Sequence, residues 1–260
     1  MLPVIRLGPL AVQTPGLILL AGLWLGLNLA ERHTEGSEVN ASDLSNLVIV
    51  GLIASLVGAR LVYVLRYPAI FATSPLSIFS LNPGLLDLWG GIAAGLIAGV
   101  VYGQRKGMRL WSTLDALTPA LAVFLVSLGV SHLASGAGYG APTNLPWGIQ
   151  MWGTVRHPAQ VYEILAAAFI LWAVWPGKPV LRIKWKGSSN QPPGWRFLSF
   201  LALTAACYLF LEAFHGDSAL LPDGLRTTQI VALILLAASL WKMGEQLKRM
   251  PKETAKQSEI

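Results

Sequence analysis

Six ionisable side chains lie within, or at the ends of, long apolar stretches of this sequence. They are Arg60, Asp87, Asp115, His132, Glu163 and Glu212. Inside an apolar helix, each would cost several kcal/mol unless it faced a polar cavity or a charged partner. Carboxylates and imidazoles in such places can accept or pass on a proton, and an arginine can hold an anion. The pattern therefore indicates a polar interior suited to acid–base or anion chemistry.

Opposite charges within this group also allow a purely structural interpretation. Arg60 can pair with Asp115 or Glu163 and do no more than hold helices together. In either case we expect Arg60 to meet one of these two carboxylates, because an unpaired guanidinium at that depth is costly. Two acids and an arginine on separate stretches imply a larger polar interior than one ion pair requires.

A glycine-rich connection, residues 134–157, follows the stretch that contains His132. Its glycines permit backbone conformations closed to other residues and allow N–H groups to approach an anion. Tyr139 and Gly140 belong to this part. Trp147 and Trp152 suit the headgroup level of a bilayer, so a loop that merely rests on lipid is the alternative.

The segment from Arg156 to Glu163 combines a cation, an imidazole, an amide and a carboxylate. Pro158 can begin a helix that carries Gln160 and Glu163 along one inner face. The residues just before the proline then stand at the positive N-terminal end of that helix, which suits an anionic headgroup. We expect one outward-opening polar cavity here, lined by Tyr139, Arg156, His157, Gln160 and the glycine-rich backbone.

The composition indicates an integral membrane protein. Of 260 residues, 54% are hydrophobic and 12% are charged, and the mean hydropathy is +0.56, whereas soluble domains carry about 25% charged residues. The net charge of +6 does not point to nucleic acid, because most cations flank apolar stretches, where they set orientation and contact headgroups. Cys207 is the only cysteine, which excludes an intrachain disulfide and a cysteine-rich metal site. We expect no metal and no cofactor.

Seven apolar stretches can hold helical spans of about 20 residues each. The expected spans lie within Leu7–Ala30, beginning near Pro15, and at Leu44–Leu65, Leu85–Gly103, Leu114–Leu133, Pro158–Trp175, Phe197–Phe214 and Thr227–Trp241. The first stretch is expected to remain as a span, since no signal-peptide cleavage pattern follows it. The sequence thus predicts an all-α integral membrane protein with about seven transmembrane helices. Residues 1–245 should form one membrane domain and residues 246–260 a basic cytoplasmic tail.

Lysine and arginine are divided unevenly between the two sets of alternate connections. One set holds fourteen of them, and the other holds only Arg6, Arg66, Arg156 and Arg226. Short connections rich in these residues stay in the cytoplasm. With seven spans, the N-terminus is therefore expected outside and the C-terminus in the cytoplasm.

Motifs along nearly the whole chain resemble those of the bacterial prolipoprotein diacylglyceryl transferases. Arg156–Glu163 reads RHPAQVYE where the family has RHPSQLYE, and Gly58–Leu65 resembles its GxRxxYVL segment. Further matches follow in the same order: Trp89-Gly90-Gly91 at the family's HGG, Asp115 and Pro119 at its D-x-x-x-P pattern, Gly136, Tyr139 and Gly140 along its GRIGNFxNGExxG loop, Leu145–Gly148 at the PWG that can follow, and Glu212 with Gln229 and Ile230 in the last two helices.

This resemblance implies an activity. The family moves the diacylglyceryl group of phosphatidylglycerol onto the thiol of a lipobox cysteine in a secreted precursor and releases glycerol phosphate. It implies a multi-pass protein of the bacterial plasma membrane, with phosphatidylglycerol and prolipoprotein signal peptides as partners. Such chemistry needs a base for the thiol and cations or N–H donors for the phosphate.

The departures from the family pattern fall on positions that carry the chemistry. The histidine of HGG is replaced by Trp89, the arginine and asparagine of GRIGN by Gly129 and His132, the glutamate of NGE by Ala137, and two sixth-helix arginines by Tyr208 and His215.

The retained motifs together with the replaced positions allow two functions. In the first, the chain is a divergent transferase with His132 as base, Arg156 and Arg226 as phosphate clamp, and Glu163 and Asp115 as orienting carboxylates. The full set expected to bind lipid or phosphate is Arg60, Tyr139, Gly140, Arg156, His157, Gln160, Glu212 and Arg226. In the second, the chain is a non-catalytic relative that serves as a lipid-binding or accessory membrane subunit. A transporter is not indicated, because the sequence has no internal repeats.

Overall fold

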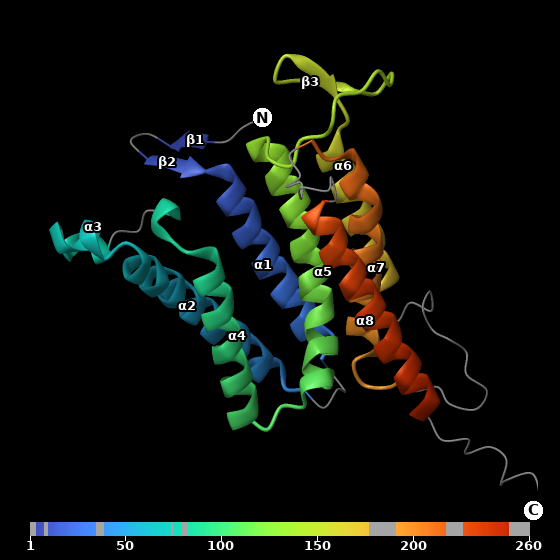
Figure 1. The fold of residues 1–260 in the computed structure, drawn as a ribbon. Coiled ribbons are helices and arrows are strands. Elements are labelled where there is room, and N and C mark those ends of the chain that lie inside the picture. The colour runs from blue at the N-terminus through green and yellow to red at the C-terminus, as the bar shows by residue number, and fades with distance from the viewer. Residues whose placement is uncertain are drawn as a thin grey trace, which may run out of the picture. The chain divides into compact units, whose positions relative to one another are not determined.

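The computed structural model describes residues 4–7, 10–34, 39–73, 75–79, 83–176, 191–216 and 226–249 (Figure 1). The chain divides into two compact units, one formed by Met1–His33 with Leu117–Ile260 and the other by Thr34–Ala116. The cations expected on the cytoplasmic side at positions 178–186, and residues 250–260 of the expected tail, lie outside the described residues.

Within the described residues, a helix of fifteen or more residues occupies each of the seven predicted stretches. These helices are α1 (Thr14–Arg32), α2 (Ala41–Arg66), α4 (Leu88–Arg105), α5 (Leu110–Ser135), α6 (Ala159–Ala173), α7 (Trp195–Leu211) and α8 (Thr227–Arg249). In the described part of the chain, five segments are long and apolar enough to cross a membrane, namely α1, α2, α5, α7 continued to Phe214, and α8, and α6 is a shorter apolar helix. The chain is therefore a multi-pass membrane protein.

Side-chain caps set two helix starts that the apolar pattern alone misplaces. Asn40 accepts a hydrogen bond from the Ser42 backbone N–H at 2.9 Å, so α2 begins at Ala41, ahead of the predicted Leu44. Asp87 accepts from the Gly90 N–H at 2.7 Å, so α4 begins at Leu88, after the predicted Leu85. A cap of this kind satisfies a first-turn N–H that the helix itself leaves unpaired, and it stabilises a helix by about 1 kcal/mol.

Two short antiparallel hairpins accompany the helices. Strand β1 (Val4–Leu7) pairs with β2 (Leu10–Gln13) ahead of α1, and β3 (Ile149–Met151) pairs with β4 (Thr154–Arg156) between α5 and α6. The first hairpin occupies the start of the apolar stretch 7–30, so α1 begins at Thr14, next to the predicted start. The second turns at Trp152 and Gly153, where both φ angles are positive.

In the unit Thr34–Ala116, α2 packs along α4 through small residues. A Cβ on Gly95 would lie 3.0 Å from the Gly51 carbonyl oxygen, and one on Gly58 would lie 3.0 Å from that of Gly90. Such close backbones require glycine. The chain passes from α2 to α4 through the short helices α3 (Pro68–Thr73), η1 (Pro75–Phe79) and η2 (Pro83–Leu85).

The guanidinium of Arg60 binds this returning segment. Its Nη1 donates to the Leu85 carbonyl oxygen at 2.7 Å, its Nε to that of Ile78 at 2.8 Å, and its Nη2 to that of Ser77. All three guanidinium nitrogens thus have backbone acceptors, and these take the place of the carboxylate that we expected from Asp115. The charge is solvated by oriented carbonyl dipoles, an arrangement that suits an arginine fork. Glu163, the other expected partner, belongs to the other unit.

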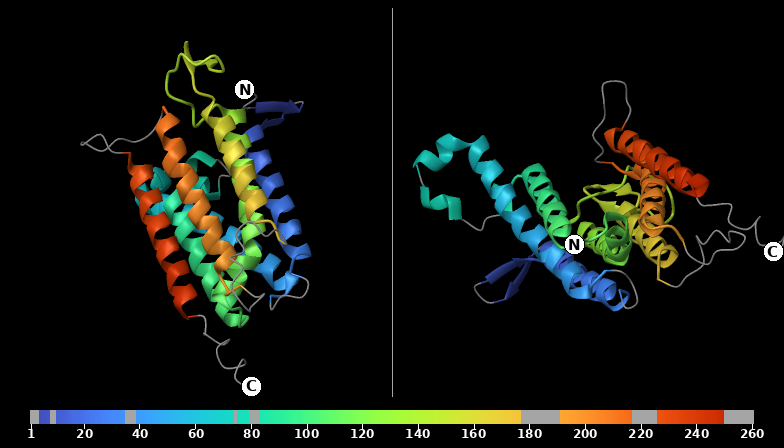
Figure 2. Two further views of the ribbon diagram at one scale, coloured as in Figure 1. Left: turned by 90° about the vertical axis from the view of Figure 1, so that its right-hand side faces the viewer. Right: turned by 90° about the horizontal axis from the view of Figure 1, so that it is seen from below.

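In the unit of Met1–His33 and Leu117–Ile260, α5, α6 and α7 share an apolar core around Ala122, Ile170 and Phe200. Helix α5 meets α6 closely, since a Cβ on Gly129 would lie 2.9 Å from Ile164 Cγ1. Helix α7 packs against α6 and α8 (Figure 2). The C-terminal ends of α5 and α7 consequently lie beside the N-terminal end of α6.

Candidate functional site

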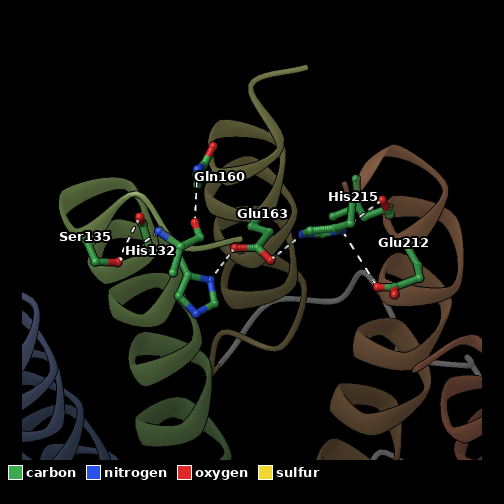
Figure 3. A network of polar contacts seen from close by, with 8 residues as sticks. His132, Ser135, Gln160, Glu163, Glu212 and His215 are labelled. Carbon is green, nitrogen blue, oxygen red and sulfur yellow. Dashed lines mark hydrogen bonds and ion pairs between the residues drawn. The ribbon is translucent and has the colours of Figure 1, made fainter. Parts of the chain in front are cut away.

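Glu163 lies between two histidines that come from different parts of the chain, one in α5 and one just after α7 and its 3-10 extension (Figure 3). Nδ1 of His132, in the last turn of α5, is 2.8 Å from Oε2, and Nε2 of His215, just after η3 (Glu212–Phe214), is 3.0 Å from Oε1. We call these three residues the His–Glu–His network. The side chains of Glu163 and His215 are 8% and 7% exposed, whereas that of His132 is 29% exposed. The network is therefore buried on the His215 side and accessible at His132.

The partners of each ring nitrogen determine where the protons reside. An ionised carboxylate only accepts hydrogen bonds, so both ring nitrogens that face Glu163 must donate. In a neutral His132, the proton on Nδ1 leaves the acceptor lone pair on Nε2. His215 presents its Nδ1 to two more acceptors, the Leu211 carbonyl oxygen at 3.2 Å and the Glu212 carboxylate at 3.8 Å. This surrounding of acceptors favours a ring in which both nitrogens donate, an imidazolium whose charge would offset that of Glu163.

The charge of His215 has a clear electrostatic origin. The hydrogen bond to Glu163 raises the pKa of His215 above its ordinary value, burial opposes this, and the negative charges of Glu163 and Glu212 and the Leu211 carbonyl add to the increase. Arg226 donates from Nη1 to the His215 carbonyl oxygen at 3.0 Å, which holds the backbone at this point. Glu163 is thus held from one side by His215, whose charged form is favoured, and contacts His132 on the other.

A short glycine loop, residues 136–140, covers this region. Gly136 and Gly138 have φ angles of 81° and 61°, a conformation that favours glycine. A Cβ on Gly138 would lie 3.3 Å from His132 Nδ1, so the loop packs against the imidazole. Gln160 is fully buried and donates from Nε2 to the Ala137 carbonyl oxygen at 3.0 Å, while its Oε1 has no hydrogen-bond partner among the described residues. Gln160 therefore anchors the loop above the network.

Backbone hydrogen bonds join the glycine loop to the segment after α7. The Ala141 N–H donates to the Phe214 carbonyl oxygen at 2.8 Å, and the Gly216 N–H to that of Tyr139 at 2.9 Å. On the other side, the His157 N–H donates to the Ala141 carbonyl oxygen at 3.0 Å. These bonds hold three chain segments together around the His–Glu–His network.

Arg156 links the β3–β4 hairpin to the same loop. Its Nη1 donates to the Gly140 carbonyl oxygen at 3.2 Å, its Nε to that of Met151 at 3.3 Å, and its guanidinium lies 5.0 Å from the centre of the Tyr139 ring. The ring of His157 meets Phe214 edge-on at 5.2 Å, and its Nδ1 is buried without a partner in the described part of the chain. These contacts give Arg156 a structural task, and phosphate binding by Arg156 stays a prediction.

The structure brings most of the predicted site residues together in one unit. His132, Glu163 and Glu212 belong to the network and its immediate surroundings, and Tyr139, Gly140, Arg156, His157, Gln160 and Arg226 surround the glycine loop or the adjoining backbone. Arg60 and Asp115 belong to the other unit, as does Trp89, whose side chain is 75% exposed.

His215 is the residue of this network that sequence reasoning missed. It stands three positions after Glu212 and outside the apolar run, so nothing marked it as a membrane-buried ionisable group. The available signal was its position, because it replaces an arginine of the family pattern within the same segment as Glu212.

Comparison with known proteins decides the family. A sequence model of the prolipoprotein diacylglyceryl transferase family matches residues 3–244. The chain belongs to this family. A phosphatidylglycerol–prolipoprotein diacylglyceryl transferase of Bordetella parapertussis is 30% identical over 251 residues, which cover 94% of this chain and 88% of that protein.

Two further family members give the range of similarity. The enzyme of the same name from Cupriavidus metallidurans is 34% identical over 182 residues, or 65% of this chain and 67% of that protein. The one from Nostoc sp. is 25% identical over 253 residues, or 91% of this chain and 86% of that protein. The family relationship thus extends over most of the chain, including the helices that carry the His–Glu–His network.

The charged state of His215 predicts how stability depends on pH. An unfolded histidine titrates near pH 6.5, and the folded-state pKa of His215 is raised. The stabilisation by the charged ring is therefore fully present below about pH 6.5 and is lost as the pH rises through the folded-state pKa. We expect the difference in Tm between wild type and His215→Gln, measured in detergent, to be largest near pH 6 and to shrink toward pH 9.

The matched control is the same substitution in a Glu163→Gln background, where the pH dependence of the difference should be lost because the carboxylate that raises the pKa is gone. A difference in Tm that stays constant from pH 6 to pH 9 would show that His215 is not held as an imidazolium.

Proposed function

We propose that this chain transfers the diacylglyceryl group of phosphatidylglycerol to the thiol of a prolipoprotein cysteine, with the His–Glu–His network as its proton acceptor. The observation that carries the proposal is the contact between His132 and the buried carboxylate of Glu163. A histidine held in this way presents its second ring nitrogen as a base, the role that imidazole most often has in enzymes. The names of the relatives from Bordetella, Cupriavidus and Nostoc support the same reaction.

In the proposed reaction, the cysteine thiol gives its proton to His132 Nε2. The thiolate attacks the glycerol carbon that bears the phosphate, the S–C bond forms, and the C–O bond breaks. Its electron pair leaves on the oxygen of glycerol phosphate. Glu163 stabilises the imidazolium that forms at His132, and His215 prevents the Glu163 carboxylate from turning away.

The remaining predicted residues keep their proposed roles in lipid binding. Arg156 and Arg226 are the proposed phosphate clamp, supported by their placement beside the glycine loop and the His215 backbone. The other proposed contributors are Arg60, Tyr139, Gly140, His157, Gln160 and Glu212 as lipid- or phosphate-binding residues and Asp115 as an orienting carboxylate.

A second function is supported by a specific observation. A side chain at position 129 has no room, since a Cβ there would lie 2.9 Å from Ile164 Cγ1, so the family's arginine cannot be accommodated in this packing. With the imidazole of HGG also replaced by an exposed tryptophan, the chain would then be a non-catalytic, lipid-binding or accessory membrane subunit. Binding needs only donors and cations, whereas transfer also needs the positioned base.

The proposed setting is the bacterial plasma membrane, with seven spans, the N-terminus outside and the C-terminus in the cytoplasm. The uneven distribution of cations supports this orientation. It puts the connection between α4 and α5 inside and the β3–β4 hairpin outside. Reporter fusions in the full chain at Gly107 and at Gly153 test it, and we expect a cytoplasmic signal from the first and an external signal from the second. The reverse pair of signals would overturn the orientation.

Complementation of a transferase-depleted bacterium tests the activity. We expect growth with this chain, as with a family member that has intact HGG and GRIGN motifs, and no growth with empty vector. In an assay with phosphatidylglycerol vesicles and a lipobox peptide, His132→Gln should lower the transfer rate by about 100- to 10,000-fold, the usual contribution of a general base.

The matched control is His33→Gln, which removes a histidine that contacts the Leu29 carbonyl oxygen and Trp175 at the end of α1, and it should transfer at the wild-type rate. A membrane-inserted wild-type chain that neither complements nor transfers would favour the accessory function. Equal rates in wild type and His132→Gln would remove His132 as the base.

A further inference from the structure

A second polar cavity lies within the unit Thr34–Ala116, where α4 turns into α5 beside the start of α2. Its volume is about 310 Å³. The residues that determine its polarity are Asn40, Asp43, Lys106, Gly107, Arg109 and Ser112. We call it the basic cavity. Ser112 is in the first turn of α5 and His132 in its last, so this cavity is distinct from the His–Glu–His network.

Two cations and one acid line the basic cavity. The ammonium of Lys106 is 3.1 Å from Asp43 Oδ1 and 5.9 Å from the centre of the Tyr102 ring, and the Tyr102 hydroxyl donates to the same oxygen at 3.5 Å. The hydrogen bond to Asp43 raises the pKa of Lys106. The lysine side chain is 48% exposed, and an ammonium has three donors. Lys106 is thus both positioned by the protein and accessible to an acceptor from outside.

Both cations belong to one tight turn of the backbone. Gly107 has a φ of 66°, the Met108 N–H donates to the Gly103 carbonyl oxygen at 2.9 Å, and the Gly107 N–H donates to that of Gln104 at 3.1 Å. This turn joins α4 to α5, and Lys106 and Arg109 lie at its two ends. The site is therefore built on a tight turn between two helices, which reduces the ordering cost on binding.

The chemistry of the cavity selects among ligand classes. Its volume is at the lower end of the range for small-molecule sites, about 300–1,000 Å³. Two cations, a hydroxyl and an amide do not suit an acyl chain, but they do suit a compact anion with several acceptor oxygens. The lining residues carry two cationic side chains, Lys106 and Arg109, and one carboxylate, Asp43.

We propose that the basic cavity binds a phosphate group, with Lys106 and Arg109 as its cations and the Ser112 hydroxyl as a further donor. The phosphate can belong to a phospholipid headgroup of the adjoining leaflet or to a soluble phosphate. Its binding would link the start of α2, the end of α4 and the start of α5, and it would stabilise this unit by mass action. This site does not depend on whether transfer takes place at the His–Glu–His network.

The test measures binding to the full chain in detergent by isothermal titration calorimetry, with two probes, sodium phosphate and dihexanoyl phosphatidic acid. In the double variant Lys106→Gln/Arg109→Gln, affinity should fall at least about tenfold, as for lost charge-assisted hydrogen bonds. The control is Lys242→Gln, which breaks an ion pair of the same kind, Lys242–Glu245 at 2.8 Å on α8, and it should bind both probes as wild type does.

The two probes distinguish the sources of the phosphate. A loss confined to the phosphatidic acid identifies a lipid headgroup, a loss confined to sodium phosphate identifies a soluble phosphate, and a loss for both identifies a site that accepts either. Each of these outcomes supports a phosphate site. Affinities in the double variant equal to wild type for both probes would overturn the proposal.

A variant that is expected to bind phosphate more tightly excludes misfolding as the cause of weaker binding in the double variant. Asp43 is the only acid among the lining residues, so Asp43→Asn removes the negative charge that competes for Lys106. We expect this variant to bind at least one probe severalfold more tightly than wild type, which a misfolded protein does not do. Unchanged or weaker binding of both probes by Asp43→Asn would contradict the assignment of Lys106 as a phosphate ligand.

Discussion

The carboxylate of Glu163 accepts one hydrogen bond from each of two imidazoles, at 2.8 and 3.0 Å, and the ends of three helices meet around it. A buried carboxylate that loses its partners destabilises a protein by about 3–5 kcal/mol. The hydrogen bonds from His132 and His215 therefore stabilise the buried carboxylate of Glu163, and the same bonds position the two histidine rings. The Leu211 carbonyl and Glu212 contact the far side of the His215 ring. His215 in turn holds Glu163, and Glu163 holds the ring of His132, which is the more accessible of the two histidines.

The residues at positions 129 and 132 both contact α6. Both lie on α5 one helical turn apart, and they face the consecutive residues Ile164 and Glu163 of α6. Glycine at position 129 allows α6 to approach α5 so closely that a Cβ would lie 2.9 Å from the Ile164 side chain. In the same contact between α5 and α6, Glu163 Oε2 lies 2.8 Å from His132 Nδ1. Gly129 and His132, which replace an arginine and an asparagine of the family pattern, thus face neighbouring residues of the same helix.

The positions of the seven helices could be predicted from sequence because charged, proline-rich or glycine-rich connections separate long apolar stretches. The placement of Glu163 and His132 in a polar interior followed from the high cost of ionisable groups in apolar helices. The acceptors of Arg60 could not be predicted, because backbone carbonyls of η1 and η2 have no side-chain signature. His215 could not be paired with Glu163, since 52 positions separate them and only the packing of α6 on α7 brings them together.

The proposed base requires one protonation pattern of the His–Glu–His network, and nitrogen NMR of the ¹⁵N-histidine-labelled chain in detergent measures this pattern directly. The chain has four histidines, and His132→Gln and His215→Gln assign the two signals of interest. Near neutral pH, we predict a neutral His132 ring protonated at Nδ1 and a His215 ring protonated at both nitrogens, with both patterns lost in Glu163→Gln. A neutral His132 ring protonated at Nε2, unaffected by Glu163→Gln, would contradict the central claim that Glu163 orients His132 as a base.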